Sequence, residues 1–303
     1  MSDKCSLLTR ESGEPLAGSA EQVQCWVMLE FRGAWKSMAL EDNDLARPVQ
    51  DWFGSNIEAL RARGVKTRPQ FIRQQHSRDK DQLSLFVGFC DPASPRLYEF
   101  TATAHEGFSG LDLGALLDDP AAYTDKLVEG DRYFVCTNGQ RDACCAIYGM
   151  RVYAQLARQC GDAAWQTTHL GGHRFAATLV SLPTGAVYGQ LEPMDVNALL
   201  DAQGAGELHL PKLRGLSSLD TVSQWADIAL RERSGHTRSE RYLLQEQGSR
   251  DGVERRVFLD SNDNSRHEIF LKPVSEAFEF HASCGEEKPK SRWLYEVLPA
   301  DKD

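Results

Sequence analysis

The chain has 303 residues, of which 41% are hydrophobic and 26% charged, proportions typical of a folded globular protein long enough for two domains. Its net charge of −10 argues against nucleic-acid binding, because contacts to phosphates require clustered Lys and Arg, but it suits a partner with a basic docking face. No stretch approaches the roughly 20 apolar residues of a membrane helix, and the polar N-terminal sequence does not have the apolar core of a signal peptide, so we expect a cytoplasmic protein.

The first part of the chain predicts a small α/β layer. Residues 25–35 are rich in β-branched and aromatic side chains and predict a strand. Residues 43–64 predict a helix that Pro48 can open and Gly64 can end. A connector follows at 105–130. Three further strands are predicted between this helix and the connector, at 68–75, 83–91 and 96–104.

A second series with the same order of elements starts at Asp131. A strand is predicted at 131–137, a helix at 144–161 and another strand at 163–169, and the turn at 183–185 suits two antiparallel strands. Two more helices and then a run of strands beyond His236 complete the chain. The predicted fold class is α/β (α+β): two small α/β layers and a C-terminal β appendage. The predicted domains are 1–125, 126–235 and 236–303.

The residues with the most distinctive chemistry lie between Tyr133 and His173. Cys136 falls at the end of the first predicted strand of the second series, where α/β folds often place ligands. Cys144 and Cys145 open the next helix, whose N-terminal N–H groups favour a thiolate. His169 and His173 bracket two glycines, which let the backbone fold tightly enough for both imidazoles to face one point. This set of thiols and imidazoles predicts a metal centre.

Four motifs carry a resemblance to a known family. CTNGQRDACCAIYG and HLGGHRFAATLVSLPTGAVYGQLEP, with CWVMLEFRGAW upstream and FEFHASCG downstream, resemble the sucrase/ferredoxin-like family, which includes thioredoxin-like ferredoxins. The resemblance implies a thioredoxin-like domain that binds one [2Fe–2S] cluster. The implied ligands are Cys136, Cys145, His169 and His173. A shift of one residue in the alignment would make Cys144 the ligand in place of Cys145.

The leading interpretation is an electron carrier, rather than an enzyme, in which electron transfer is proton-coupled if one imidazole reaches solvent. A structural zinc site is an alternative, although Cys-x₈-Cys is wider than the usual zinc spacing. A thiol oxidoreductase that uses Cys144 and Cys145 is another, although it has no Cys-x-x-Cys motif. No dinucleotide-binding fingerprint follows a predicted strand, so we expect a separate redox partner protein, a reductase or an acceptor.

The remaining cysteines stand alone in the sequence and are expected to act as small hydrophobic residues of the core. His281 and Cys284 form a His-x₂-Cys pair, which is expected to be structural because no second pair accompanies it. The cysteines assigned to this group are Cys5, Cys25, Cys90, Cys160 and Cys284.

Overall fold

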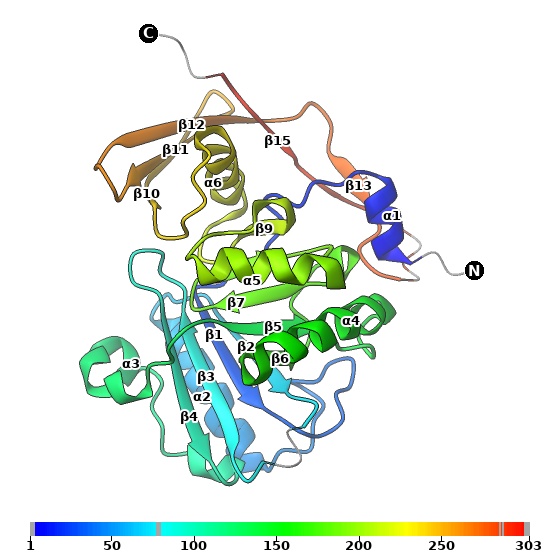
Figure 1. The fold of residues 1–303 in the computed structure, drawn as a ribbon, viewed down its shortest axis with the longest axis vertical. Helices are drawn as coiled ribbons and strands as arrows, with labels where there is room; N and C mark the ends of the chain where they lie inside the picture. Colours follow the sequence, from blue (N-terminus) through cyan, green and yellow to red (C-terminus); the bar gives the residue numbers. More distant parts are fainter. Residues whose placement is uncertain (1–3, 77–79, 285, 287, 300–303) are drawn as a thin grey trace.

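The structure, a computed structural model, describes residues 4–76, 80–284, 286 and 288–299. One nine-stranded sheet forms its centre (Figure 1). Its strands are β1 (Cys25–Glu30), β2 (Thr67–Arg73), β3 (Leu83–Phe89), β4 (Arg96–Ala102), β5 (Arg132–Cys136), β6 (Ala164–Thr167), β7 (Leu179–Leu182), β8 (Ala186–Tyr188) and β9 (Leu213–Leu216).

Helices cover this sheet and connect its strands. The α-helices are α1 (Cys5–Glu11), α2 (Arg47–Ala62), α3 (Ala115–Asp118), α4 (Ala143–Cys160), α5 (Val196–Gly204) and α6 (Thr221–Ser234). Short 3₁₀ helices are η2 (His105–Phe108), η3 (Pro120–Lys126), η4 (Gly161–Ala163), η5 (His173–Phe175), η6 (Pro193–Asp195) and η7 (Leu210–Lys212). Among the described residues, no helix is both long and apolar enough to cross a membrane.

The central sheet contains the same arrangement twice. Its strand order is β4-β3-β1-β2-β6-β5-β7-β8-β9. β1 is parallel to β2 and antiparallel to β3, and β5 is likewise parallel to β6 and antiparallel to β7. The second half forms the second of the two expected α/β layers, and the first half, which repeats its topology, forms the other. The halves join where β2 and β6 pair antiparallel through Ile72 with Thr167 and Arg73 with Gln166.

Apolar side chains from both halves meet where the sheet curls. The ring of Phe86 on β3 lies 5.8 Å from that of Phe134 on β5 and 5.3 Å from that of Trp165 on β6. Separate clusters lie beneath α2 in the first half and beneath α4 and α5 in the second. Because β1 is covered on both faces, all six of its residues are buried. The predicted domain boundaries at 125 and 235 stay a prediction.

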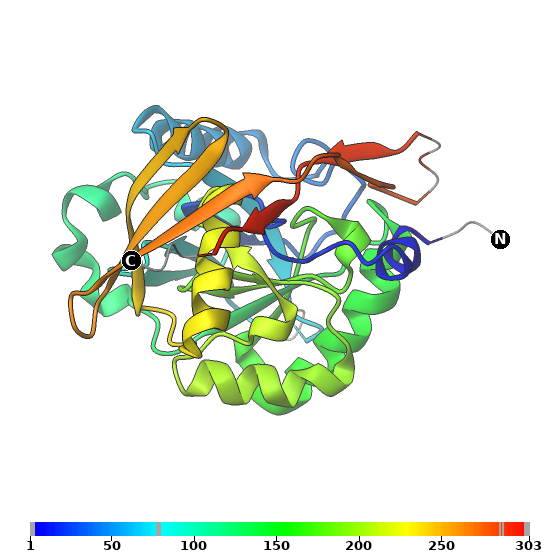
Figure 2. The same cartoon turned by 90° about the horizontal axis from the view of Figure 1, so that it is seen from above.

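The C-terminal part of the chain forms the expected β appendage. Its strands pack on α6 through Tyr242, Phe258 and Ile269, and then a hairpin crosses to α1 (Figures 1 and 2). This hairpin therefore lies beside the first helix (Figure 1). The larger sheet holds β10 (Tyr242–Arg250), β11 (Val253–Asp260), β12 (Arg266–Pro273) and β15 (Tyr295–Val297), and the hairpin holds β13 (Phe278–Phe280) and β14 (Lys290–Arg292).

Candidate metal centre

Cys136 and Cys145 lie at a strand end and a helix start, as expected. Cys136 is the last residue of β5, and its N–H donates to Thr178 O at 3.0 Å. Asp142 caps α4 by accepting a hydrogen bond from Cys144 N at 2.9 Å. Successive residues of an α-helix point about 100° apart, because a turn takes 3.6 residues. Cys145 therefore faces Cys136, whereas Cys144 faces α1.

The loop after β6 holds both histidines. Gly171 and Gly172 adopt φ values of 90° and 71°, which residues other than glycine rarely adopt. The tight turn brings the two imidazole centroids to 4.8 Å. Arg68 Nη2 donates to His169 O at 2.8 Å, so β2 of the first half helps to fix this loop of the second half.

Three of the four expected ligands come together, and the fourth lies beside them. The ligand atoms of Cys136, Cys145 and His169 all lie within 4.8 Å of one another. His173 is outside this group, and its Nε2 lies 3.8 Å from Asp142 Oδ2. Among the described residues, neither His169 Nδ1 nor either ring nitrogen of His173 has a hydrogen-bond partner, although all three are buried. Unsatisfied buried imidazole nitrogens beside two thiols fit a bound metal or cluster.

The electrostatics of the site favour a thiolate at Cys136 and a neutral imidazole at His173. A hydrogen bond from Cys145, supported by His169, holds the pKa of Cys136 well below that of a free thiol in spite of its burial. The pKa of Cys145 is raised because it shares its proton with Cys136 and is buried. Burial lowers the pKa of His173, and nearby His169 lowers it further, so the His173 imidazole is neutral, as metal binding requires.

One side of the site opens into a cleft. A cavity of about 670 Å³ runs between α2 and the loops that carry Asn138 and His169, and its lining also includes Arg68 and Arg141. His169 is half-buried, whereas His173 is buried. The two imidazoles therefore differ in their access to solvent, a difference that the sequence does not indicate.

A second group of thiols lies next to the first. Cys5, Asp142, Cys144 and Cys284 place one ligand atom each within 4.8 Å of one another. Cys5 is buried in the core, as expected, but neither Cys5 nor Cys284 is isolated there, because the fold brings both against Cys144. They were missed because 139 and 140 positions separate them from Cys144.

The chain matches one protein family and one solved structure. The model of the sucrase/ferredoxin-like family matches residues 16–215, a range that holds the four expected ligands but neither Cys5 nor Cys284. A solved thioredoxin-like [2Fe–2S] ferredoxin from Aquifex aeolicus is 19% identical over 28% of this chain and 91% of its own, with a TM-score of 0.24. The comparison with curated proteins found no match.

Proposed function

Because the chain belongs to the sucrase/ferredoxin-like family, we propose that it is an electron carrier whose Cys136, Cys145, His169 and His173 bind one [2Fe–2S] cluster. The observation that carries this proposal is the convergence of two buried thiols and one imidazole within 4.8 Å. The unpartnered nitrogens of both histidines support it further. When bound, a cluster with two histidine ligands supplies one-electron transfer at a higher potential than an all-cysteine cluster.

In this proposal the cysteines supply negative charge to the cluster, and a histidine exchanges a proton with solvent. Cys136, whose pKa is lowered, supplies one negative charge, and Cys145, whose pKa is raised, would supply a second when binding of the cluster displaces its proton. His173 is buried and neutral, whereas His169 borders the cleft. An imidazole that binds metal through one nitrogen keeps an N–H on the other, which can exchange with solvent where it is accessible. We therefore propose that His169 couples electron transfer to proton transfer.

The partner is proposed to be a separate redox protein. The net charge of −10 favours a partner with a basic docking face. The sequence offers no dinucleotide fingerprint, so electrons would come from or pass to another protein. All eight cysteines are described and none forms a disulfide, which agrees with the reducing, cytoplasmic location that we propose.

A zinc site is the second candidate for the same residues. Ligand atoms within 4.8 Å of one another also fit a single tetrahedral ion. A thiol oxidoreductase that uses Cys144 and Cys145 has less support, because the Sγ of Cys144 lies 3.7 Å from Cys5 and 3.3 Å from Cys284, on the other side of the helix.

Absorption and metal content decide between these candidates. The full chain, purified without oxygen, should be red-brown and contain about two irons and two acid-labile sulfides. Cys160→Ser, which removes a half-buried thiol at the far end of α4, should retain both and serves as a control. A colourless protein that holds zinc without iron at the site of Cys136 would contradict the electron-carrier proposal.

A further inference from the structure

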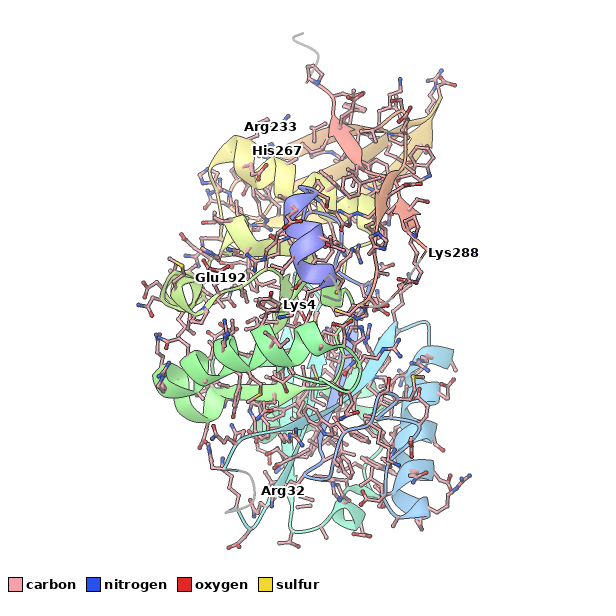
Figure 3. The ribbon with its side chains drawn as sticks, turned by 90° about the vertical axis from the view of Figure 1, so that its right-hand side faces the viewer. Lys4, Arg32, Glu192, Arg233, His267 and Lys288 are labelled. Carbon is pink, nitrogen blue, oxygen red and sulfur yellow. The ribbon has the colours of Figure 1, made fainter. Side chains whose placement is uncertain are left out.

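Three thiols from distant parts of the chain meet beside the N-terminus of α4. Cys5 is the first residue of α1, Cys144 lies in the first turn of α4, and Cys284 follows β13. Their Sγ atoms are 3.7 Å apart for Cys5 and Cys144, 3.3 Å for Cys144 and Cys284, and 3.6 Å for Cys284 and Cys5. Figure 3 shows Lys4, next to Cys5, at the end of α1 nearest α4.

Asp142 completes the group with a carboxylate. Its Oδ1 lies 3.9 Å from the Sγ of Cys5 and 3.4 Å from that of Cys284. Two main-chain N–H groups fix the carboxylate, that of Cys144 at 2.9 Å and that of Cys284 at 3.0 Å. The position of this side chain is therefore determined by both segments that it joins.

The separations match those of ligands around one tetrahedral ion. With bonds of about 2.3 Å to sulfur and about 2.0 Å to oxygen, tetrahedral zinc sets sulfur ligands about 3.8 Å apart and sulfur and oxygen about 3.5 Å apart. The observed Sγ–Sγ distances of 3.3, 3.6 and 3.7 Å and the Sγ–Oδ1 distances of 3.4 and 3.9 Å lie near these values. Donors of this softness and geometry select zinc over magnesium or calcium.

Charge gives an independent reason for a cation here. Asp142 is buried, and its side chain is surrounded by thiols that can themselves become anionic. Among the described residues, no lysine or arginine forms an ion pair with Asp142, and the Nε2 of His173 lies 3.8 Å from its Oδ2. A buried carboxylate without a cation is costly, and a bound dication removes that cost.

We propose that Cys5, Asp142, Cys144 and Cys284 bind one structural zinc ion. Zinc replaces the thiol protons on binding, so three thiols release up to three protons. The ion would hold α1 and the segment after β13 against the first turn of α4, which carries Cys145. This proposal does not depend on the [2Fe–2S] cluster, because it uses none of the four cluster ligands.

Metal analysis of the full chain, expressed with both iron and zinc, tests the site. The parent protein should hold about one zinc at this site, and Cys5→Ser and Cys284→Ser should each lose it and keep the visible spectrum. Cys160→Ser, a thiol on the same helix as Cys144, should keep zinc and colour. A zinc content equal to that of the parent in both Cys5→Ser and Cys284→Ser would overturn the proposal. The same comparison applies if the protein is colourless and binds a second zinc at Cys136.

Thiol labelling provides a test without substitutions, in case the variants do not fold. Alkylation and peptide mapping of the parent protein should find Cys5, Cys144 and Cys284 protected, and a chelator should expose all three together. A Cys144–Cys284 disulfide in a zinc-free protein would overturn the zinc site and assign these thiols to a redox pair instead. Equal labelling with and without chelator would also overturn it.

Discussion

Two neighbouring cysteines have different environments because of the geometry of the helix that carries them. Cys144 and Cys145 are adjacent in the sequence and both lie in the first turn of α4. The side chain of Cys145 approaches Cys136, and that of Cys144 approaches Cys5 and Cys284. Asp142 belongs to the second group, contacts Cys284 there, and lies 3.8 Å from His173 on its other side.

This difference predicts opposite effects of the same substitution. Cys136→Ser and Cys145→Ser should each remove the cluster or destabilise it severely, because each loses a thiolate ligand. Cys144→Ser should leave the visible absorption near that of the parent and remove the zinc. Visible spectra and iron content of the three variants provide the measurement. If Cys144→Ser bleaches the protein and Cys145→Ser does not, the ligand assignment is off by one residue.

The exposure of His169 predicts a potential that depends on pH. Oxidised iron favours loss of the remaining imidazole N–H, so above the oxidised-state pKa the gain of an electron also gains a proton. The midpoint potential should then fall as pH rises, with a slope approaching about −59 mV per unit. His169→Cys should lower the potential and flatten this slope, and His173→Cys should lower the potential too. A parent potential that is independent of pH would exclude proton coupling.

At the scale of elements, the packing of α4 on β5 sets the distance between Cys136 and Cys145. Gly149 lies one turn after Cys145, and a Cβ built on it would clash with the main-chain oxygen of Cys136. A backbone carbonyl cannot rotate away as a side chain can. The close approach of helix and strand therefore requires glycine at this position.

Gly149→Ala should push α4 away from β5 and lower both stability and cluster content. The expected loss in the free energy of unfolding is about 1–3 kcal/mol, the usual cost of overpacking. Urea denaturation and iron analysis measure the two effects. Gly54→Ala is the matched control, because Gly54 lies in α2 with open space around its Cβ position. That variant should gain up to about 1 kcal/mol from helix propensity, and equal behaviour of the two variants would contradict the packing argument.

At the scale of the whole molecule, the N-terminal segment at Glu14 and the C-terminal hairpin meet beside the candidate metal centre. The carboxylate of Glu14 is fully buried and pairs with Arg174 at 2.8 Å and with Arg292 at 3.0 Å. Arg174 also stacks on Phe280 of β13, 3.8 Å from the ring centroid. These contacts link the N-terminal segment, the residue after His173 and the C-terminal hairpin.

Glu14→Gln should release this assembly. The substitution leaves two largely buried guanidinium groups without a carboxylate, so the free energy of unfolding should fall by about 3 kcal/mol. Limited proteolysis should then cut the C-terminal segment faster, and the zinc proposed at Cys284 should dissociate more readily. Asp42→Asn, which removes the exposed ion pair between Asp42 and Lys36, should cost no more than about 1 kcal/mol. Equal stability losses in the two variants would argue against a special role for Glu14.

The sequence by itself determined the parts of the protein that depend on residues close together in the chain. The end of a strand, the first turn of a helix and a Gly-Gly turn place Cys136, Cys145, His169 and His173, and each of these follows from local rules. The two α/β layers and the β appendage also follow from local periodicity. Which residues bind the proposed cluster stays a prediction until metal analysis tests it.

Only the tertiary structure decided the relations between distant segments. Three features join residues about 100 or more positions apart in the sequence. They are the pairing of β2 with β6, the cleft at His169, and the meeting of Cys5, Cys144 and Cys284. Periodicity reports which face of an element is buried, but it carries no information on which other element covers that face. A cysteine that lies alone in the sequence therefore looks like an ordinary core residue until the fold brings a second thiol against it.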